Sequence, residues 1–284
     1  MKKILIIGGD IRYLYLIEKL REHNFDIDVL GYEKTSYSML NVNKITLDEL
    51  NINNYDFIFL PVSSIDNEGN IKAEFSDKEI NLSKVNFNIL KEKAYIIAGI
   101  KTKFMEELNI KNVIYFMEDD DIAIYNSVAT AEGVIMKIIE NTNYTIYGSN
   151  ILVLGYGRCG ETISRYLKSL GARVSVLVRD NKNYAKAEIL GYNPYKIAEL
   201  DNHLGEFNVI INTIPNLILD KEKINLIDSN AYLLDIASTN GFDMEYAIKN
   251  GIKIEKFMSI PAVIAPASAA PIIFDKISEV IFND

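Results

Sequence analysis

The sequence has few of the side chains that most often carry redox, metal and acid–base chemistry. It contains one cysteine, Cys159, and two histidines, His23 and His203. A single cysteine excludes a disulfide within the chain and a metal cluster held by cysteines, so no metal site is predicted. Both histidines fall in helical segments and are expected on the surface. Histidine is the commonest acid–base side chain, and the sequence offers no clear candidate of this kind.

Positive charge and long apolar runs are also scarce. Asp and Glu number 39 against 30 Lys and Arg, which gives a formal net charge of −9. No basic run occurs, and this balance argues against nucleic acid as a partner. We find no apolar run long enough to span a membrane and no signal peptide at the N-terminus. The sequence therefore predicts a cytoplasmic protein with no membrane partner.

Strand-like and helical segments alternate along almost the whole chain. Short apolar, β-branched runs are followed by turns or by helical spacing of apolar residues, which predicts right-handed βαβ units and parallel sheets. The polar stretch at residues 64–86 interrupts the pattern and is expected to be an inserted hairpin. The strands are predicted at residues 3–9, 26–32, 55–63, 94–100, 112–119, 151–154, 173–178, 209–213, 231–235 and 253–257.

A polar segment at residues 141–150 follows a long helical pattern and marks a domain boundary. The fold class predicted is therefore α/β, with two Rossmann-like or flavodoxin-like parallel-sheet domains and a cleft between them. The expected parts are a substrate-side domain at residues 1–142 and a dinucleotide-binding Rossmann domain at 143–265. Residues 266–284 are expected to form a last helix that can pack back on the first domain.

A glycine-rich loop, GYGRCG, joins an apolar strand to a helical pattern in the second half. Gly155 allows a tight turn, Gly157 lets the backbone approach a pyrophosphate, and Gly160 lets the helix pack on the strand. Arg158 and Cys159 lie within the loop and are predicted with it to contact the cofactor at the helix N-terminus. Cys159 is expected to fill space there and not to act as a nucleophile. The plain alternative is a glycine turn without a ligand, and the agreement of strand, loop and helix argues against it.

The end of the next strand distinguishes between the two nicotinamide cofactors. Arg179 lies 24 residues after Gly155 (179 − 155), and Asp180 follows it. An arginine at this position accommodates the 2′-phosphate of NADP, whereas an acidic residue binds the ribose of NAD. Because Arg179 comes first at the strand end, the sequence favours NADP. NAD remains the alternative, with Arg179 solvated and Asp180 on the ribose.

Two further strand ends carry polar residues at the edge where ligands bind in open α/β sheets. "INTIP" supplies Asn212, Thr213 and Pro215, and "LLDIAS" supplies Asp235, Ala237 and Ser238. Asn212, Thr213, Pro215, Ala237 and Ser238 are predicted to contact the cofactor, and the Asn212-Thr213 loop is predicted to line its nicotinamide side. The alternative is that they are ordinary turn residues.

Several segments resemble the A subunit of dipicolinate synthase from spore-forming bacteria. The resemblance covers nearly the whole chain, and the most specific segment is residues 120–136. One departure lies at residues 265–270, which read APASAA where the family commonly has AP-x-T-A-G. The segments that carry the resemblance are IIGGDIR (6–12), LPVS (60–63), DDIAIYNSVATAEGVIM (120–136), YTIYGSNILVLGYGRCG (144–160) and INTIPNLIL (211–219).

The resemblance implies a reaction, a cofactor and a partner. The chain would oxidise a dihydrodipicolinate-type intermediate to dipicolinate with NADP as the hydride acceptor, in the mother cell of a sporulating bacterium. A second, flavoprotein-like B subunit would act with it. Whether the chain also forms a homo-oligomer is left open by the sequence.

A small ring with two carboxylates must be held by cations, hydroxyls or helix N-termini. In the first half the best-placed groups follow predicted strands, and they are Asp10, Arg12, Ser63 and Ser64. Polar residues that interrupt the long apolar helix are the catalytic candidates, and they are Asn126, Ser127, Thr130 and Glu132.

Each of these candidates has a plain alternative. Arg12 can be solvated or paired with Asp10, Asn126 and Thr130 can form a buried polar network, and Glu132 can be a surface carboxylate. Two other functions also remain open. One is an NADP oxidoreductase similar to shikimate dehydrogenase, which the NTIP loop also fits, and the other is a non-catalytic nucleotide-binding subunit. The absence of histidine after His203 argues against a 2-hydroxyacid dehydrogenase with a late catalytic histidine.

Overall fold

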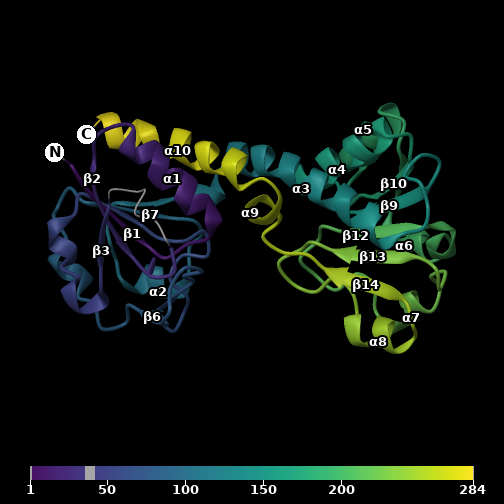
Figure 1. Ribbon diagram of the computed structural model, residues 1–284. Helices are drawn as coiled ribbons and strands as arrows, with labels where there is room; N and C mark the ends of the chain where they lie inside the picture. Colours follow the sequence, from purple (N-terminus) through teal and green to yellow (C-terminus); the bar gives the residue numbers. More distant parts are fainter. Residues whose placement is uncertain (1, 36–41, 284) are drawn as a thin grey trace. The chain divides into compact units, whose positions relative to one another are not determined.

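The computed structural model describes residues 2–35 and 42–283, which form two compact units (Figure 1). Unit 1 comprises Met1–Tyr125 and Ala265–Asp284, and unit 2 comprises Asn126–Ile264. Each unit contains one six-stranded sheet in which every neighbouring pair of strands is parallel. The predicted class of two parallel-sheet α/β domains is therefore confirmed.

In unit 1 the strands have the order β3-β2-β1-β4-β7-β8. The short antiparallel pair β5-β6 lies in the polar stretch at 64–86 and confirms the predicted hairpin. The strand β3 was not predicted, because this edge strand of three residues has little apolar character. The elements are β1 (Lys3–Ile7), α1 (Ile11–Arg21), β2 (Asp26–Leu30), β3 (Asn43–Ile45), β4 (Phe57–Phe59), β5 (Asn70–Ile71), β6 (Ile80–Asn81), β7 (Tyr95–Ala98), α2 (Lys103–Glu107), β8 (Val113–Tyr115), the start of α3 (Asp120–Asn141) and α10 (Pro266–Asn283).

The C-terminal helix α10 completes the core of unit 1. Figure 1 shows it beside α1, although the two helices lie at opposite ends of the chain. Ile273, Ile277 and Ile281 recur at helical spacing and are at most 2% exposed. They pack in the cluster that contains Leu16 and Leu20 of α1. The apolar faces of α10 and α1 cover each other. Truncating α10 would therefore expose the apolar face of α1.

A buried carboxylate ties three segments of unit 1 together. Asp28, 3% exposed, accepts hydrogen bonds from the Tyr55 hydroxyl (2.6 Å) and from Asn43, and forms an ion pair with Lys3 (3.0 Å). Burial by itself would raise the pKa of Asp28, but the hydrogen bonds from Tyr55 and Lys3 outweigh it and hold this pKa below its usual value. The ionised carboxylate is therefore the form that the fold stabilises.

Replacing Tyr55 with Phe is expected to lower the free energy of unfolding by about 2 kcal/mol near neutral pH, because a hydrogen bond to a charged group is lost. Since the pKa of Asp28 is lowered in the folded protein, this stabilisation is complete above the unfolded value of about 3.9 and disappears as the pH falls through the folded pKa. Urea unfolding across this acidic range should show wild type and variant converging. Tyr246→Phe, which removes a bond to the neutral Asn225, is the control and should show no such convergence.

In unit 2 the strands have the order β11-β10-β9-β12-β13-β14, the order of a dinucleotide-binding Rossmann domain. The strand β11, a short edge strand that contains Pro194, was not predicted. The elements are the remainder of α3, β9 (Asn150–Leu154), α4 (Arg158–Ser169), β10 (Arg173–Leu177), α5 (Asn181–Ile189), β11 (Asn193–Tyr195), α6 (Ile197–Leu200), β12 (Val209–Asn212), α7 (Lys221–Ile224), β13 (Tyr232–Asp235), α8 (Met244–Lys249), β14 (Lys253–Lys256) and α9 (Ile260–Ile264).

The boundary between the units falls inside α3, between Tyr125 and Asn126, and so before the boundary expected at residue 142. The reason is that Ala131, Val134 and Ile138 pack into the core of unit 2. By length and mean hydropathy α3 is apolar enough to cross a membrane. The expectation that no segment of the chain has this length and composition is therefore wrong. Half of its most apolar window is buried inside the protein, and a core helix accounts for this composition.

Candidate functional site

The glycine loop of unit 2 has the backbone that a bound pyrophosphate requires. Gly155 follows β9 with φ +102°, and a Cβ there would meet Thr213 Oγ1 at 2.4 Å. A Cβ at Gly160 would lie 2.1 Å from the carbonyl oxygen of Gly155, whereas a Cβ at Gly157 would meet nothing within 4 Å. Gly155 and Gly160 are therefore needed by the fold itself. Gly157 leaves open space, which is the space a dinucleotide phosphate would use.

Helix α4 begins at this loop without a side-chain N-cap. Its N-cap is Gly157, which has no side-chain hydrogen bond to offer. Uncapped amides and the helix dipole together favour an anion. The one acidic residue of the first turn, Glu161, is paired with Lys186 (2.6 Å), and this pair offsets its charge. The loop is therefore suited to a phosphate even though the chain as a whole is acidic.

Cys159 lies in the same loop, half-buried. Burial raises the pKa of its thiol, and the nearby Arg158 only partly opposes this shift. A raised pKa keeps the thiol protonated and unreactive near neutral pH. This agrees with the expectation that Cys159 fills space.

The strand end after β10 places Arg179 and Asp180 in different roles. Arg179 is exposed. Asp180 is the N-cap of α5, and its carboxylate accepts hydrogen bonds from the backbone amide (2.8 Å) and side-chain amide (3.1 Å) of Asn183. The pKa of Asp180 is lowered by the bond from the Asn183 amide and further by Lys196 and Arg179. The Asp180 carboxylate therefore caps α5, whereas the exposed Arg179 side chain takes no part in that cap.

Lys196 adds a second cation that was not predicted from the sequence. It follows β11, the neighbour of β10, and its ammonium donates to the carbonyl oxygen of Arg179 (3.4 Å). The signal available in the sequence was a lysine directly after an edge strand, but that strand itself was not recognised. Arg179 and Lys196 thus supply two cationic residues at the neighbouring ends of β10 and β11.

The loops after β12 and β13 contain the other predicted cofactor residues. Asn212 is fully buried, and its amide bonds to Ile214 and Asp235. The Thr213 hydroxyl donates to the carbonyl oxygen of Leu154 (2.9 Å), which fastens this loop to the strand before the glycine loop. Pro215 and Ser238 are exposed, and Ala237 is buried.

In unit 1 the backbone amides of the glycine turn after β1 are hydrogen-bonded to other parts of the protein. The amide of Gly8 donates to Leu30 and that of Gly9 donates to Lys72 in the inserted hairpin segment. A Cβ at Gly8 would lie 2.7 Å from the Lys72 carbonyl oxygen. These amides are therefore already used, and the first unit does not repeat the open glycine loop of the second.

The predicted substrate residues of unit 1 form two separate local arrangements. Arg12 is 5% exposed and makes a two-pronged ion pair with Asp10, at 2.6 and 2.9 Å. Ser64 is buried with φ +61° and bonds to the backbone of Ile100, while Ser63 is exposed. Ser63 and Ser64 line a hollow of about 470 Å³, whose wall also includes Lys72.

The four candidates on α3 differ in their surroundings. Ser127 is fully buried and shares a hydrogen bond with Thr162 of α4 (2.7 Å), and the Thr130 hydroxyl donates to the Asn126 carbonyl oxygen (2.9 Å). Asn126 is 8% exposed, and Glu132 is exposed. The bond between Thr130 and Asn126 agrees with the alternative in which these two residues are bonded within the protein. Glu132 presents its carboxylate at the surface.

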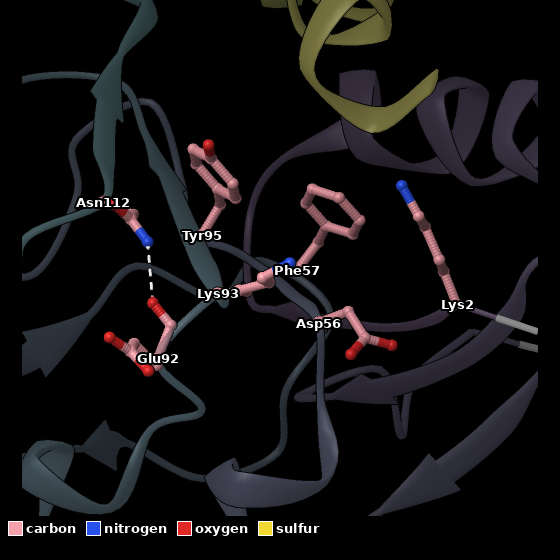
Figure 2. Close-up of a pocket in the computed structure, with 7 residues that line it drawn as sticks. All are labelled: Lys2, Asp56, Phe57, Glu92, Lys93, Tyr95 and Asn112. Atoms are coloured by element: carbon pink, nitrogen blue, oxygen red, sulfur yellow. Dashed lines mark hydrogen bonds between the residues drawn. The ribbon is translucent and has the colours of Figure 1, made fainter. Parts of the chain in front are cut away.

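Another hollow lies at the opposite edge of the first sheet, where β4, β7 and β8 begin. This hollow has a volume of about 400 Å³, and Asn112 donates to the carbonyl oxygen of Glu92 (3.0 Å). Figure 2 shows its lining residues and this hydrogen bond. Ligands of open parallel sheets bind at the carboxyl edge instead. No predicted site residue is among its lining residues, which are Lys2, Asp56, Phe57, Glu92, Lys93, Tyr95 and Asn112.

Comparison with known proteins gives a consistent picture over the whole chain. Residues 3–118 match the family model of the N-terminal domain of the dipicolinate synthase A subunit. Residues 126–266 match the model described as S-adenosyl-L-homocysteine hydrolase, NAD binding domain. The division between the two matches agrees with the boundary between the two units.

Two of the relatives and solved structures match nearly the whole chain, and another relative matches about half of it. The A subunit of dipicolinate synthase from Bacillus subtilis is 36% identical over 98% of this chain and 95% of its own length. The crystal structure of the corresponding A subunit from Bacillus halodurans aligns with a TM-score of 0.91 at 34% identity, covering 99% of this chain and 98% of that one. Adenosylhomocysteinase of Thermotoga maritima is 31% identical over 49% of this chain and 33% of its own length.

Proposed function

Because the chain belongs to the family of dipicolinate synthase A subunits, we propose that it oxidises a dihydrodipicolinate-type intermediate to dipicolinate and passes the hydride to NADP. The observation that carries this proposal is the glycine loop of unit 2. Of its three glycines, only Gly157 has open space beside it, and α4 begins there without a side-chain N-cap. The match to an NAD binding domain supports a nicotinamide dinucleotide as the cofactor. Within that class, NADP is our proposal.

The choice of NADP is supported by the charges around the end of β10. Asp180, the residue that would bind an unphosphorylated ribose, has both carboxylate oxygens engaged by Asn183. Arg179 and Lys196 supply positive charge at the same strand ends. A guanidinium recognises phosphate by charge-assisted hydrogen bonds, and this is the contact that a 2′-phosphate adds to the ribose.

The residues of this chain have three tasks in the proposed reaction. The bound nicotinamide supplies a hydride acceptor. The start of α4 and Arg179 hold the phosphates. We propose that the substrate carboxylates are recognised by Arg12 and the exposed hydroxyl of Ser63, with Asp10 orienting the Arg12 guanidinium through their two-pronged pair. The Ser64 hydroxyl already bonds to the backbone of Ile100, so Ser64 is proposed to hold this turn in place and not to donate to the substrate.

Proton removal is proposed for α3. Oxidation to an aromatic ring releases one proton in addition to the hydride, and Glu132 has the exposed carboxylate among the four candidates. Ser127 and Thr130 keep their bonds to Thr162 and Asn126 and would hold this part of the helix rigid. Asn126 is the fourth residue of the catalytic set that we propose on α3.

A partner protein and a place in the cell are part of the same proposal. A family of A subunits implies a partner B subunit, which we propose is flavoprotein-like. We propose that both act in the cytoplasm of the mother cell during sporulation.

The test is turnover by the purified chain with freshly prepared dihydrodipicolinate-type substrate and NADP, followed by NADPH absorbance, with and without the B subunit. We expect NADPH to form, and formation only in the presence of the B subunit would show that the partner is required. A reaction without NADP is the blank. If the chain neither binds NADPH nor reduces NADP under either condition, the proposal is overturned. Binding without any turnover would instead favour a nucleotide-binding subunit without catalysis.

A further inference from the structure

Two fully buried polar side chains connect the loops that follow β12 and β13. Asp235, at the end of β13, is 0% exposed and accepts hydrogen bonds from the Asn212 side-chain amide (2.9 Å) and from the backbone amides of Ala237 (3.1 Å) and Gly241 (2.8 Å). Lys256, at the end of β14, lies 3.8 Å from the same carboxylate. One side chain thus holds the ends of three neighbouring strands.

Both polar atoms of the Asn212 side chain form hydrogen bonds in the same arrangement. Its amide nitrogen donates to Asp235 and to the carbonyl oxygen of Ile214 (2.9 Å), and its amide oxygen accepts from the amide of Ile214 (3.1 Å). Gly241 approaches so closely that a Cβ would lie 1.9 Å from the Asn212 amide nitrogen. With every polar atom used and no exposed surface, the Asn212 side chain is placed to shape its loop and not to touch a ligand.

The loop after β12 is fastened next to the glycine loop. Thr213 donates through both its amide (3.0 Å) and its hydroxyl (2.9 Å) to the carbonyl oxygen of Leu154, the residue before Gly155. In a Rossmann domain the pyrophosphate crosses the sheet at this point, so the nicotinamide half extends over the ends of the following strands, here β12 and β13. A shift of either loop would therefore move the wall that faces the reacting ring.

A purely apolar cluster would hold these strand ends at least as strongly, since burying a carboxylate costs solvation energy. An apolar side chain could not, however, accept two loop amides and one side-chain amide in fixed directions. The benefit of Asp235 is therefore geometric: it determines the path of residues 237–241 and of residues 212–214 together.

We infer that Asp235 and Asn212 are positioning residues, which set the two loops that hold the nicotinamide half of the cofactor. This inference rests on the proposed function for its catalytic consequence, but its structural part does not. It also changes the role of Asn212 from a predicted cofactor contact to a residue that acts through the loop backbone.

The test compares Asp235→Asn with wild type by three measurements. In the variant an NH₂ group replaces one acceptor oxygen. Either the Gly241 amide, or both the Ala237 amide and the Asn212 side-chain amide, would then lose the acceptor that Asp235 offers. We expect faster hydrogen exchange at the amide of Ala237 or of Gly241, whichever loses its acceptor. We also expect a fall in kcat of roughly a hundredfold, as follows from a small misplacement of reacting groups. Binding of 2′,5′-ADP, which represents the adenosine phosphate half alone, should not change.

Gly241→Ala is the second variant, for the case that Asp235→Asn does not fold. Its new methyl group must displace the Asn212 amide, so it disturbs the same loops while leaving the carboxylate in place. Asp220→Asn is the matched control, because Asp220 caps α7 in the same unit and should affect neither kcat nor exchange at residues 237 and 241.

Each outcome decides the inference. Unchanged kcat with exchange as in wild type would overturn it, and so would a loss of kcat without faster exchange at either residue 237 or residue 241. Loss of 2′,5′-ADP binding in both variants would show a general collapse of unit 2 and would also contradict a role confined to the nicotinamide half. If wild type itself shows no turnover, the proposed function fails, while hydrogen exchange still tests whether Asp235 holds the loops.

Discussion

Replacing Gly157 with alanine is expected to weaken NADPH binding by roughly a hundredfold while leaving the stability of the protein unchanged. The backbone of Gly157 has φ −97°, which any residue adopts, and a Cβ there meets no protein atom within 4 Å. The added methyl group would instead occupy the space of the pyrophosphate and separate it from the amides of α4. Losing charge-assisted hydrogen bonds of about 1.5–3 kcal/mol corresponds to this change in affinity. Fluorescence titration and thermal unfolding measure the two quantities.

Gly160→Ala is the contrasting variant. Its Cβ would lie 2.1 Å from the Gly155 carbonyl oxygen, a backbone atom that cannot move aside without shifting the turn. We therefore expect this variant to lose both stability, by about 3 kcal/mol, and NADPH binding. If Gly157→Ala binds NADPH like wild type, the glycine loop is not the phosphate site and the proposed function loses its main support.

The strands that could be predicted from the sequence are those with a continuous apolar run. β1 and β9 are buried on both faces, so nearly every side chain in them is apolar. The edge strands β3 and β11 were missed because they have only three residues each and present polar side chains or proline. Their pairing is set by the neighbouring strand and not by their own composition, and no local pattern reveals it.

The boundary between the units was harder to predict for a similar reason. Residues 126–141 read as one continuous helix with residues 120–125, and the periodicity of α3 does not change where the helix passes from one unit to the other. What changes is the partner: Ile122 packs in the core of unit 1, and Val134 packs in the core of unit 2. Sequence periodicity reports that a face is buried, but not against which element.

The candidate site shows the same difference between local and distant information. The spacing of Gly155, Gly157 and Gly160 could be recognised because each glycine serves a local backbone need. The pairing of Asn212 with Asp235 joins residues 23 positions apart, and that of Arg179 with Lys196 joins residues 17 positions apart. These contacts depend on strand order, so polar residues at strand ends could be identified from the sequence, but their division into ligand contacts and loop supports could not.

Replacing Arg179 with alanine is expected to raise the Kd for NADP roughly tenfold to a hundredfold and to leave the Kd for NAD unchanged. The variant removes an exposed guanidinium, and the 2′-phosphate is the charged group by which NADP differs from NAD. Because the contact is at the surface, the difference should shrink as salt is added. Lys196→Ala should give a smaller change in the same direction, since an ammonium binds phosphate without the two-pronged geometry of Arg.

Two controls separate this explanation from its alternative. Arg173→Ala removes the same charge from the opposite end of β10, where the Arg173 guanidinium donates to the Asn150 side chain, and should change neither affinity. Asp180→Asn keeps the cap of α5, because asparagine caps helices as well as aspartate does. If Asp180 bound the ribose, this variant would weaken NAD binding, whereas a helix cap predicts no effect. Equal weakening of NADP and NAD by Arg179→Ala would remove the assignment of Arg179 to the 2′-phosphate and, with it, the preference for NADP.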